Sequence, residues 1–438
     1  MRRATRVRTG LLGRVSAVAV GQALPPLTAI VVTPALLATL GLQGFGLYSL
    51  IVSGQVLTSL TDLGTANTLL TEVPKAVHRR DRSAVVDVVR HAVRVACTAA
   101  VVLLLLGAAA LLAGPSLARS LATDAASSTQ VARAVAVLCL ALGLSVVGTV
   151  ALRLRQAQGH EISAWLTVGG VGAAAYGSLP LLAWAGAGVE VLVAATVLPP
   201  ALGRLALWPA ALHEVHALPV GQPTEVVPAL GRSLGRQSGL YAYLQVTSLV
   251  AYQLDQFVLS VAAGLEAVAE YAIVARVAGA AFLVCNAIAT PVWPRLAAAA
   301  AARDGAAMRH CLRFSFTASL GAATVMLVLV AALGDVLWSS LSSGTFLPST
   351  GLLVGFGLAV VLRAVDSTTA VFLNAIPVIR FQVVVATLVL VTNPLCSFVL
   401  SARYGASGAV WGTVLTQAPL VTAPYLLRMR RHLPSRLD

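Results

Sequence analysis

The sequence predicts an all-α integral membrane protein with about twelve transmembrane helices. Hydrophobic residues make up 58% of the 438 residues and charged residues only 11%, and the mean hydropathy is +0.87. A soluble domain carries roughly a quarter charged residues, so this chain has too few polar side chains to face water on all sides. Spans of about twenty apolar residues joined by short loops account for its length.

Apolar runs separated by charged breaks place six spans in each half of the chain. In the first half they cover residues 12–37, 44–66, 95–113, 131–151, 163–184 and 189–212. In the second half they cover residues 237–261, 270–293, 314–336, 351–374, 381–400 and 405–427. A hydrophilic, proline-containing linker over residues 213–237 separates the halves. We therefore expect an N-terminal six-helix lobe over residues 1–218 and a C-terminal six-helix lobe over residues 219–438.

The distribution of basic residues predicts the orientation in the membrane. The two tails and the loops on their side carry 23 of the 30 basic residues, and the opposite loops with their margins carry 3. Such an excess over short loops marks the cytoplasmic side, so both termini are predicted to be cytoplasmic. The net charge of +14 is then explained by anionic lipid at the inner leaflet rather than by nucleic acid.

One cytoplasmic segment, residues 73–94, has an amphipathic helical pattern. Val85, Val86, Val89 and Val93 fall on one face and arginines on the other. The pattern predicts a surface helix that lies on the inner leaflet.

The two halves also share landmarks in the same order, which predicts an internal repeat. Gly41 precedes Tyr48 by seven residues, and Gly264 precedes Tyr271 by seven residues. Two six-helix halves of the same orientation are related by an axis along the membrane normal, and transporters built in this way bind their substrate between the halves. A transporter is therefore the leading functional interpretation.

Charged residues inside spans are costly and are the first candidates for function. Arg363 and Asp366 lie three residues apart on one face of a predicted span, where they can neutralise each other or line a cavity. Asp255 and Arg276 fall at similar depth near the outer ends of two adjacent spans, where they form either a structural pair or an external gate. Arg14 and Asp62 form an analogous pair near the inner ends of the first two spans.

Further polar residues and prolines within spans complete the set of candidates. Pro25 and Pro26 interrupt backbone hydrogen bonding at mid-depth, which favours a hinge or a cavity wall. Gln22, Gln256 and Asn286 are the polar neutral candidates for the substrate cavity, with helix–helix contacts as the alternative role.

The sequence offers no pattern typical of catalysis or of a metal site. His213 and His216 have helical spacing for a metal ion, but no third ligand follows nearby. Phosphate-binding glycine loops and nucleophile elbows are absent from the sequence. We expect neither an enzyme nor a resident cofactor.

Two stretches resemble Wzx-type polysaccharide or O-antigen flippases of the multidrug/oligosaccharidyl-lipid/polysaccharide (MOP) superfamily. They are residues 40–50 (LGLQGFGLYSL) followed by 61–64 (TDLG), and residues 253–256 (QLDQ) followed by 270–276 (EYAIVAR) and 291–294 (PVWP). The resemblance implies two lobes of the kind seen in MATE transporters, around a cavity lined by spans one, two, seven and eight. Twelve spans speak against the related lipid II flippases, which usually have fourteen.

The resemblance further implies a transporter that flips an undecaprenyl-diphosphate-linked oligosaccharide for polysaccharide export by alternating access. Polysaccharide polymerases and glycosyltransferases would be its partners. H⁺ and Na⁺ are the candidate coupling ions, with Asp62, Asp255 and Asp366 as the carboxylates placed to bind them. Two alternatives stay open: an ion-coupled exporter of small molecules from the same superfamily, and a polytopic glycosyltransferase or ligase, which the short outer loops disfavour.

Overall fold

The computed structural model describes residues 2–55, 57, 69–70, 73, 82–114, 127–217, 243–244, 247, 254–289, 292–342, 344, 347–376 and 378–433. These residues form helices joined by short turns, and nine helices among them are long and apolar enough to cross a membrane. The prediction of an all-α membrane protein is confirmed.

Two of these nine helices hold more than one predicted span. Helix α1 (Arg2–Ser53) continues past the end of the first span, and its backbone leaves helical geometry at Gly41, where φ is 68°. Helix α16 (Ile379–Gln417) holds the eleventh span and the start of the twelfth, and its backbone turns at Gly405, where φ is 56°. Only glycine adopts such left-handed angles without a steric penalty, so both glycines act as corners. The span predicted over residues 237–261 lies mostly outside the described residues.

The chain divides into two compact units. Unit 1 comprises Met1–Leu40 and Ile51–Gln245, and unit 2 comprises Gly41–Leu50 and Val246–Asp438. The predicted lobe boundary at residue 218 falls at the edge of a stretch outside the described residues and stays a prediction.

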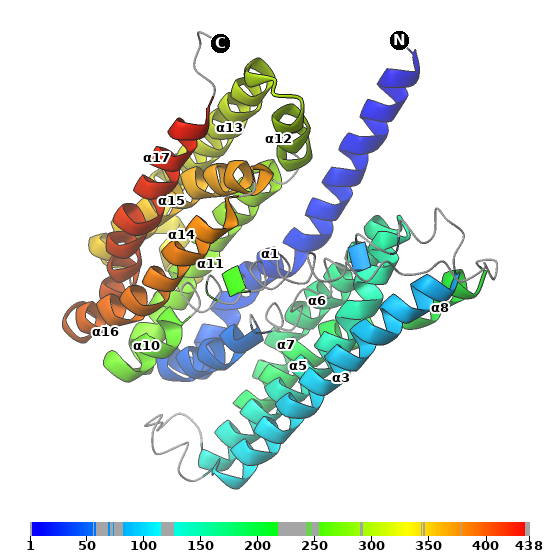
Figure 1. Cartoon of the computed structure of the whole chain (residues 1–438). Helices are drawn as coiled ribbons and strands as arrows, with labels where there is room; N and C mark the ends of the chain where they lie inside the picture. The colour runs from blue at the N-terminus through cyan, green and yellow to red at the C-terminus, as the bar shows by residue number, and fades with distance from the viewer. Residues whose placement is uncertain are drawn as a thin grey trace. The chain divides into compact units, whose positions relative to one another are not determined.

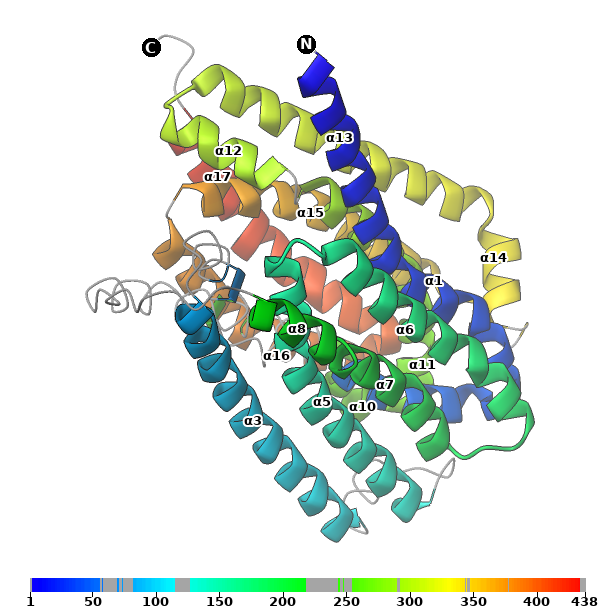
Figure 2. The ribbon, with the colours of Figure 1, turned by 90° about the vertical axis from the view of Figure 1, so that its right-hand side faces the viewer.

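In unit 1, three long helices pack side by side: α3 (Arg82–Leu112), α5 (Ser128–Ala157) and α7 (Val189–Leu205). Figure 2 shows these helices as neighbours, with α6 (Glu161–Trp184) next to α7 and the short α8 (Trp208–Ala217) after it. The opposite face of α3 is apolar and uncovered within the unit, since Leu105 is 65% and Leu112 87% exposed. A leucine face of this kind is compatible with lipid hydrocarbon rather than with water.

The amphipathic segment near residue 85 has a different location from the one predicted. Residues 82–94 form the first turns of α3, which continues directly into the apolar span. Val85 and Val89 are buried in a cluster with Val150 and Leu154 of α5 and Val215 of α8. The valine face therefore packs against protein helices and not on the inner leaflet. Periodicity alone cannot distinguish these two apolar environments.

Unit 2 is built from α10 (Asp255–Ala262), α11 (Gly264–Ala289), α12 (Val292–Ala301), α13 (Gly305–Ala332), α14 (Gly334–Leu341), α15 (Thr350–Ala375), α16, the π-helical turn η2 (Ala418–Thr422) and α17 (Ala423–His432). Within this unit, α15 packs against α11, α13 and α16, and α10 packs along α16 (Figure 1). The buried polar groups described below lie where α10, α11, α15 and α16 meet.

The ten residues Gly41–Leu50 belong to unit 2 and pack against the start of α11. The Gln43 amide donates to the Glu266 carboxylate at 3.0 Å, and Gly46 contacts the backbone carbonyl of Leu265. Gly41 and Gly264, which mark the predicted repeat, both have left-handed backbone angles, with φ of 68° and 85°.

Candidate functional site

A buried polar cluster of unit 2 surrounds Asp255, which begins helix α10. Its side chain is only 3% exposed and accepts three hydrogen bonds from hydroxyl groups. Thr413 donates at 2.8 Å, Tyr271 at 3.1 Å and Ser397 at 3.2 Å. These donors come from α11 and from two turns of α16 on either side of Gly405, so the corner at Gly405 is what allows one helix to supply two of them.

A second buried pair extends this cluster along α16. Thr416 donates to the side-chain oxygen of Asn393 at 2.9 Å, and both residues are buried. Together with Asp255, these residues place carboxylate, hydroxyl and amide oxygens close together and inside the membrane-spanning part of unit 2. Oxygen donors of this kind suit a proton or a hard cation. Among the described residues, no group of three or more His, Cys, Asp or Glu side chains could hold a metal ion.

Asp366 on α15 is the other buried carboxylate of unit 2, at 6% exposure. Gln417 donates to its Oδ2 atom at 2.6 Å, while its Oδ1 atom is buried with no hydrogen-bond partner among the described residues. Gln417 immediately precedes the π-helical turn Ala418–Thr422. Such π-helical turns are rare in proteins, and a large share of those that do occur lie at functional sites.

The expected ion pairs of unit 2 do not form within the described part of the chain. Asp366 is bonded to Gln417 rather than to Arg363, whose guanidinium lies 5.9 Å from the ring centre of Phe282. Asp255 is bonded to three hydroxyls rather than to Arg276, whose guanidinium lies 4.8 Å from the ring centre of Phe45. Aromatic faces attract arginine, so each guanidinium has an aromatic ring as a neighbour, and the charge of Arg363 also acts on Asp366.

The prolines and glycines of unit 1 form a tight crossing between α1 and α6. Gly169 contacts the backbone carbonyl of Gly21, and a Cβ atom at Gly172 would lie 2.9 Å from the ring of Pro25. Gly41 is where α1 departs from helical angles, so Pro25 and Pro26 lie in regular helix, and the ring of Pro25 contributes surface to this crossing. Their role as a hinge stays a prediction.

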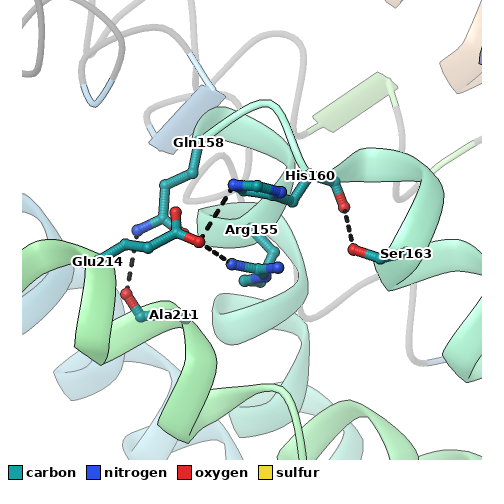
Figure 3. Close-up of polar contacts among 6 residues, drawn as sticks. All are labelled: Arg155, Gln158, His160, Ser163, Ala211 and Glu214. Atoms are coloured by element: carbon teal, nitrogen blue, oxygen red, sulfur yellow. Dashed lines mark hydrogen bonds and ion pairs between the residues drawn. The ribbon is translucent and has the colours of Figure 1, made fainter.

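The loop-side end of unit 1 carries a separate polar cluster on α5, α6 and α8, shown in Figure 3. The Glu214 carboxylate forms an ion pair with Arg155 and a 3.1 Å contact with Nε2 of His160. Gln158 donates to the backbone carbonyl of Ala211 at 3.0 Å. Arg155 is only 12% exposed, so this cluster fastens α8 to the turn between α5 and α6.

The remaining predicted candidates are scattered. Asp62 lies outside the described residues, as does the side chain of Arg14. Gln22 and Asn286 are exposed, and Gln256 is partly buried next to Asp255 in sequence. Among the predicted candidates that the structure describes, Asp255 and Asp366 are the ones with buried polar partners.

Several residues of these clusters have no signal in the sequence. Thr413, Ser397 and Gln417 are uncharged and stand among apolar neighbours, so only the fold reveals that they face a carboxylate. Arg204 on α7 is different, because an arginine inside an apolar span is a detectable signal. It donates to Ser145 of α5 at 3.0 Å.

The chain matches one family model and several solved structures. The model described as polysaccharide biosynthesis protein matches residues 11–299. No curated protein sequence matches the chain.

The similar structures are transporters of low sequence identity. An inward-facing multidrug resistance MATE family transporter of the MOP superfamily is 16% identical, with 94% of each chain covered and a TM-score of 0.63. A MOP superfamily transporter from Pyrococcus furiosus is 15% identical, covering 96% of this chain and 94% of that one, with a TM-score of 0.63. The lipid II flippase MurJ in an inward closed conformation is 11% identical, covering 95% of this chain and 88% of that one, with a TM-score of 0.66. At such identities the likeness establishes the shared fold.

Proposed function

Because the chain belongs to the polysaccharide biosynthesis protein family, we propose that it flips an undecaprenyl-diphosphate-linked oligosaccharide from the inner to the outer leaflet of the cytoplasmic membrane. Family membership, over a match that covers residues 11–299, is the observation that carries this proposal. The fold of MOP superfamily transporters supports alternating access as the mechanism. The excess of basic residues in the two tails and in the loops on their side supports cytoplasmic termini.

The intramembrane arginines of unit 2 supply chemistry that such a substrate needs. A diphosphate carries negative charge into the membrane, and guanidinium groups bind phosphate oxygens through two parallel hydrogen bonds. Arg276 and Arg363 lie within predicted spans, each against an aromatic ring. A guanidinium group carries five N–H donors in a planar fork and no acceptor, which suits the oxygens of a diphosphate.

The Asp255 cluster supports coupling to H⁺ or Na⁺. A carboxylate buried in a membrane is costly in its charged form. Binding a proton or a cation there therefore removes a large local electrostatic cost. Three hydroxyl donors from α11 and α16 converge on it. Binding or release of an ion at Asp255 would therefore change hydrogen bonds to α11 and α16, which are far apart in the sequence.

A second candidate function is the ion-coupled export of small molecules. The buried carboxylates Asp255 and Asp366 favour it, and multidrug transporters share the fold. The two functions differ in what accumulates when transport fails. A flippase for lipid-linked glycan leaves the glycan on the inner leaflet, whereas an exporter leaves small molecules in the cell.

The experiment that tests the proposal is deletion of the gene followed by lipid analysis in oriented membrane vesicles. We expect lipid-linked oligosaccharide to accumulate on the inner leaflet, and reintroducing the chain to clear it. Normal leaflet distribution after deletion would reject the proposal. Arg276→Ala and Arg363→Ala test the two arginines: if both variants, expressed normally, clear the lipid, the arginines have a structural role only.

A further inference from the structure

Unit 1 contains its own polar pocket inside the membrane-spanning part of the chain. It is a cavity of about 50 Å³ between α5 and α7, with Gln55, Ser145 and Arg204 as its polar lining and Pro200 among its apolar lining. A single water needs about 10–15 Å³ of such space. The cavity therefore has room for about three to five waters, or for one small anion with fewer waters.

The position of Arg204 in this pocket is built by the helices around it. A Cβ atom at Gly148 of α5 would lie 2.7 Å from the Cβ of Arg204, so α7 can come this close only because residue 148 is glycine. One turn away on α5, the Ser145 hydroxyl accepts a 3.0 Å hydrogen bond from the Arg204 guanidinium. The arginine is thus held at one depth and one orientation by a close helix crossing.

The pocket also lies at a discontinuity of a membrane helix. Helix α7 ends at Leu205 and α8 begins at Trp208, although both belong to the single candidate span Val189–Ala217. Arg204 lies 15 residues after Val189, about 22 Å along the helix at 1.5 Å per residue. Pro199 and Pro200 of α7 also remove two backbone N–H groups. In transporters, helix breaks at this depth line binding sites rather than lipid.

Each of the three polar side chains of the pocket can donate hydrogen bonds, and that of Arg204 also carries a fixed positive charge. The guanidinium of Arg204 donates and cannot accept, the Gln55 amide has two donors, and the Ser145 hydroxyl can rotate to donate. Such a set matches a compact ligand that carries several acceptor oxygens and negative charge. We propose that the Arg204 pocket of unit 1 binds a phosphate-type oxyanion, either inorganic phosphate or a phosphate of a lipid diphosphate head group.

The test is a binding titration on the full chain in lipid nanodiscs, with inorganic phosphate as the probe at constant ionic strength. We expect saturable binding that Arg204→Gln weakens at least tenfold and Arg204→Lys several-fold, because lysine keeps the charge but loses the planar fork. Ser145→Ala should weaken binding several-fold. The matched control is Arg133→Gln, which removes an exposed arginine from the same helix as Ser145 and should bind like the wild type.

Competition with a short-chain isoprenyl diphosphate distinguishes the two sources of the oxyanion. Displacement of phosphate by this lipid assigns the pocket to a head group, and the absence of displacement assigns it to inorganic phosphate. The proposal is overturned if the wild type binds neither probe, or if Arg204→Gln, with an unchanged thermal unfolding profile, binds phosphate as tightly as the wild type. Binding by this pocket does not depend on lipid flipping, so its failure and a failure of the flippase proposal are separate results.

Discussion

The hydroxyl of Thr413 donates a 2.8 Å hydrogen bond to the carboxylate of Asp255, a residue 158 positions earlier in the chain. Both residues are buried in unit 2, and the contact joins the start of α10 to the part of α16 beyond Gly405. It is the shortest of the three hydrogen bonds that hold the Asp255 carboxylate.

The first prediction concerns ion coupling at Asp255. Replacing Asp255 with Asn keeps the shape of the side chain but removes its ability to bind a cation or release a proton. We expect this variant to fold and to lose the dependence of transport on the Na⁺ or H⁺ gradient. Transport into vesicles under imposed gradients measures this, with Asp335→Asn as the control because Asp335 is exposed on α14. Unchanged gradient dependence in Asp255→Asn would remove Asp255 from the coupling site.

Thr413→Val isolates the hydrogen bond from the charge. The variant is close in shape and leaves the buried carboxylate with two of its three donors. Loss of a hydrogen bond to a buried charged group costs about 1.5–3 kcal/mol. We expect a lower thermal unfolding temperature in detergent, with the drop reduced when Asp255→Asn is also present, because the two changes act on one contact. Additive effects of the two changes would mean that this contact contributes little.

The glycines of α6 provide a matched pair for the helix crossing in unit 1. Gly169→Ala places a methyl group against the backbone carbonyl of Gly21, whereas Gly170→Ala points into open space. Overpacking costs about 1–3 kcal/mol, and alanine in an open helical position gains about 0.5–1 kcal/mol over glycine. Thermal unfolding should therefore fall for Gly169→Ala and stay level or rise for Gly170→Ala. Equal behaviour of the two variants would contradict the close crossing.

Arg303 is the one residue other than glycine with a positive φ among the described residues, at 54°. It lies in the turn between α12 and α13, where a side chain in left-handed geometry costs about 1–2 kcal/mol. We expect Arg303→Gly to raise the unfolding temperature. The neighbouring Asp304 caps α13 by accepting hydrogen bonds from the backbone N–H groups of Ala306 and Ala307. Asp304→Ala should therefore lower the free energy of unfolding by about 1 kcal/mol. A destabilised Arg303→Gly would show that the arginine makes compensating contacts.

The ion pair between Glu214 and Arg155 is predicted to stabilise the attachment of α8 to the turn between α5 and α6. Glu214→Gln leaves Arg155, which is only 12% exposed, without its carboxylate. Removing one partner of a largely buried hydrogen-bonded ion pair should cost about 1.5–3 kcal/mol. Hydrogen exchange should rise in α8 and in the turn between α5 and α6, while α3 stays protected. Unchanged exchange in α8 would mean that apolar contacts alone hold it.

Much of the fold follows from composition and periodicity, because a helix is the form that satisfies every backbone group within an apolar span. Gly41 and Gly264 were also detectable as equivalent positions, since their spacing to Tyr48 and Tyr271 is the same. What could not be predicted is which apolar face meets protein and which meets lipid. The Val85 face has the same pattern in either environment, and its burial against α5 and α8 depends on the tertiary fold.

The candidate site was predictable only in part. Buried carboxylates stand out in an apolar span, so Asp255 and Asp366 were identifiable from the sequence. Their partners were not, because charge matching favoured Arg276 and Arg363 whereas the fold supplies Thr413 and Gln417. Hydroxyl and amide groups are common between membrane helices and carry no pattern that marks a particular carboxylate as their partner.

The central claim is that this chain moves lipid-linked oligosaccharide between leaflets, and reconstitution tests it most directly. Proteoliposomes containing the purified chain and an undecaprenyl-diphosphate-linked oligosaccharide are exposed to an oxidant that cannot cross the membrane and attacks only outer-leaflet sugars. The account predicts that nearly all the glycan becomes oxidised in the presence of the chain, and about half in protein-free liposomes or with the Arg276→Gln/Arg363→Gln double variant. Oxidation that stops at about half with the folded wild-type chain, under imposed H⁺ and Na⁺ gradients as well as without them, would contradict it.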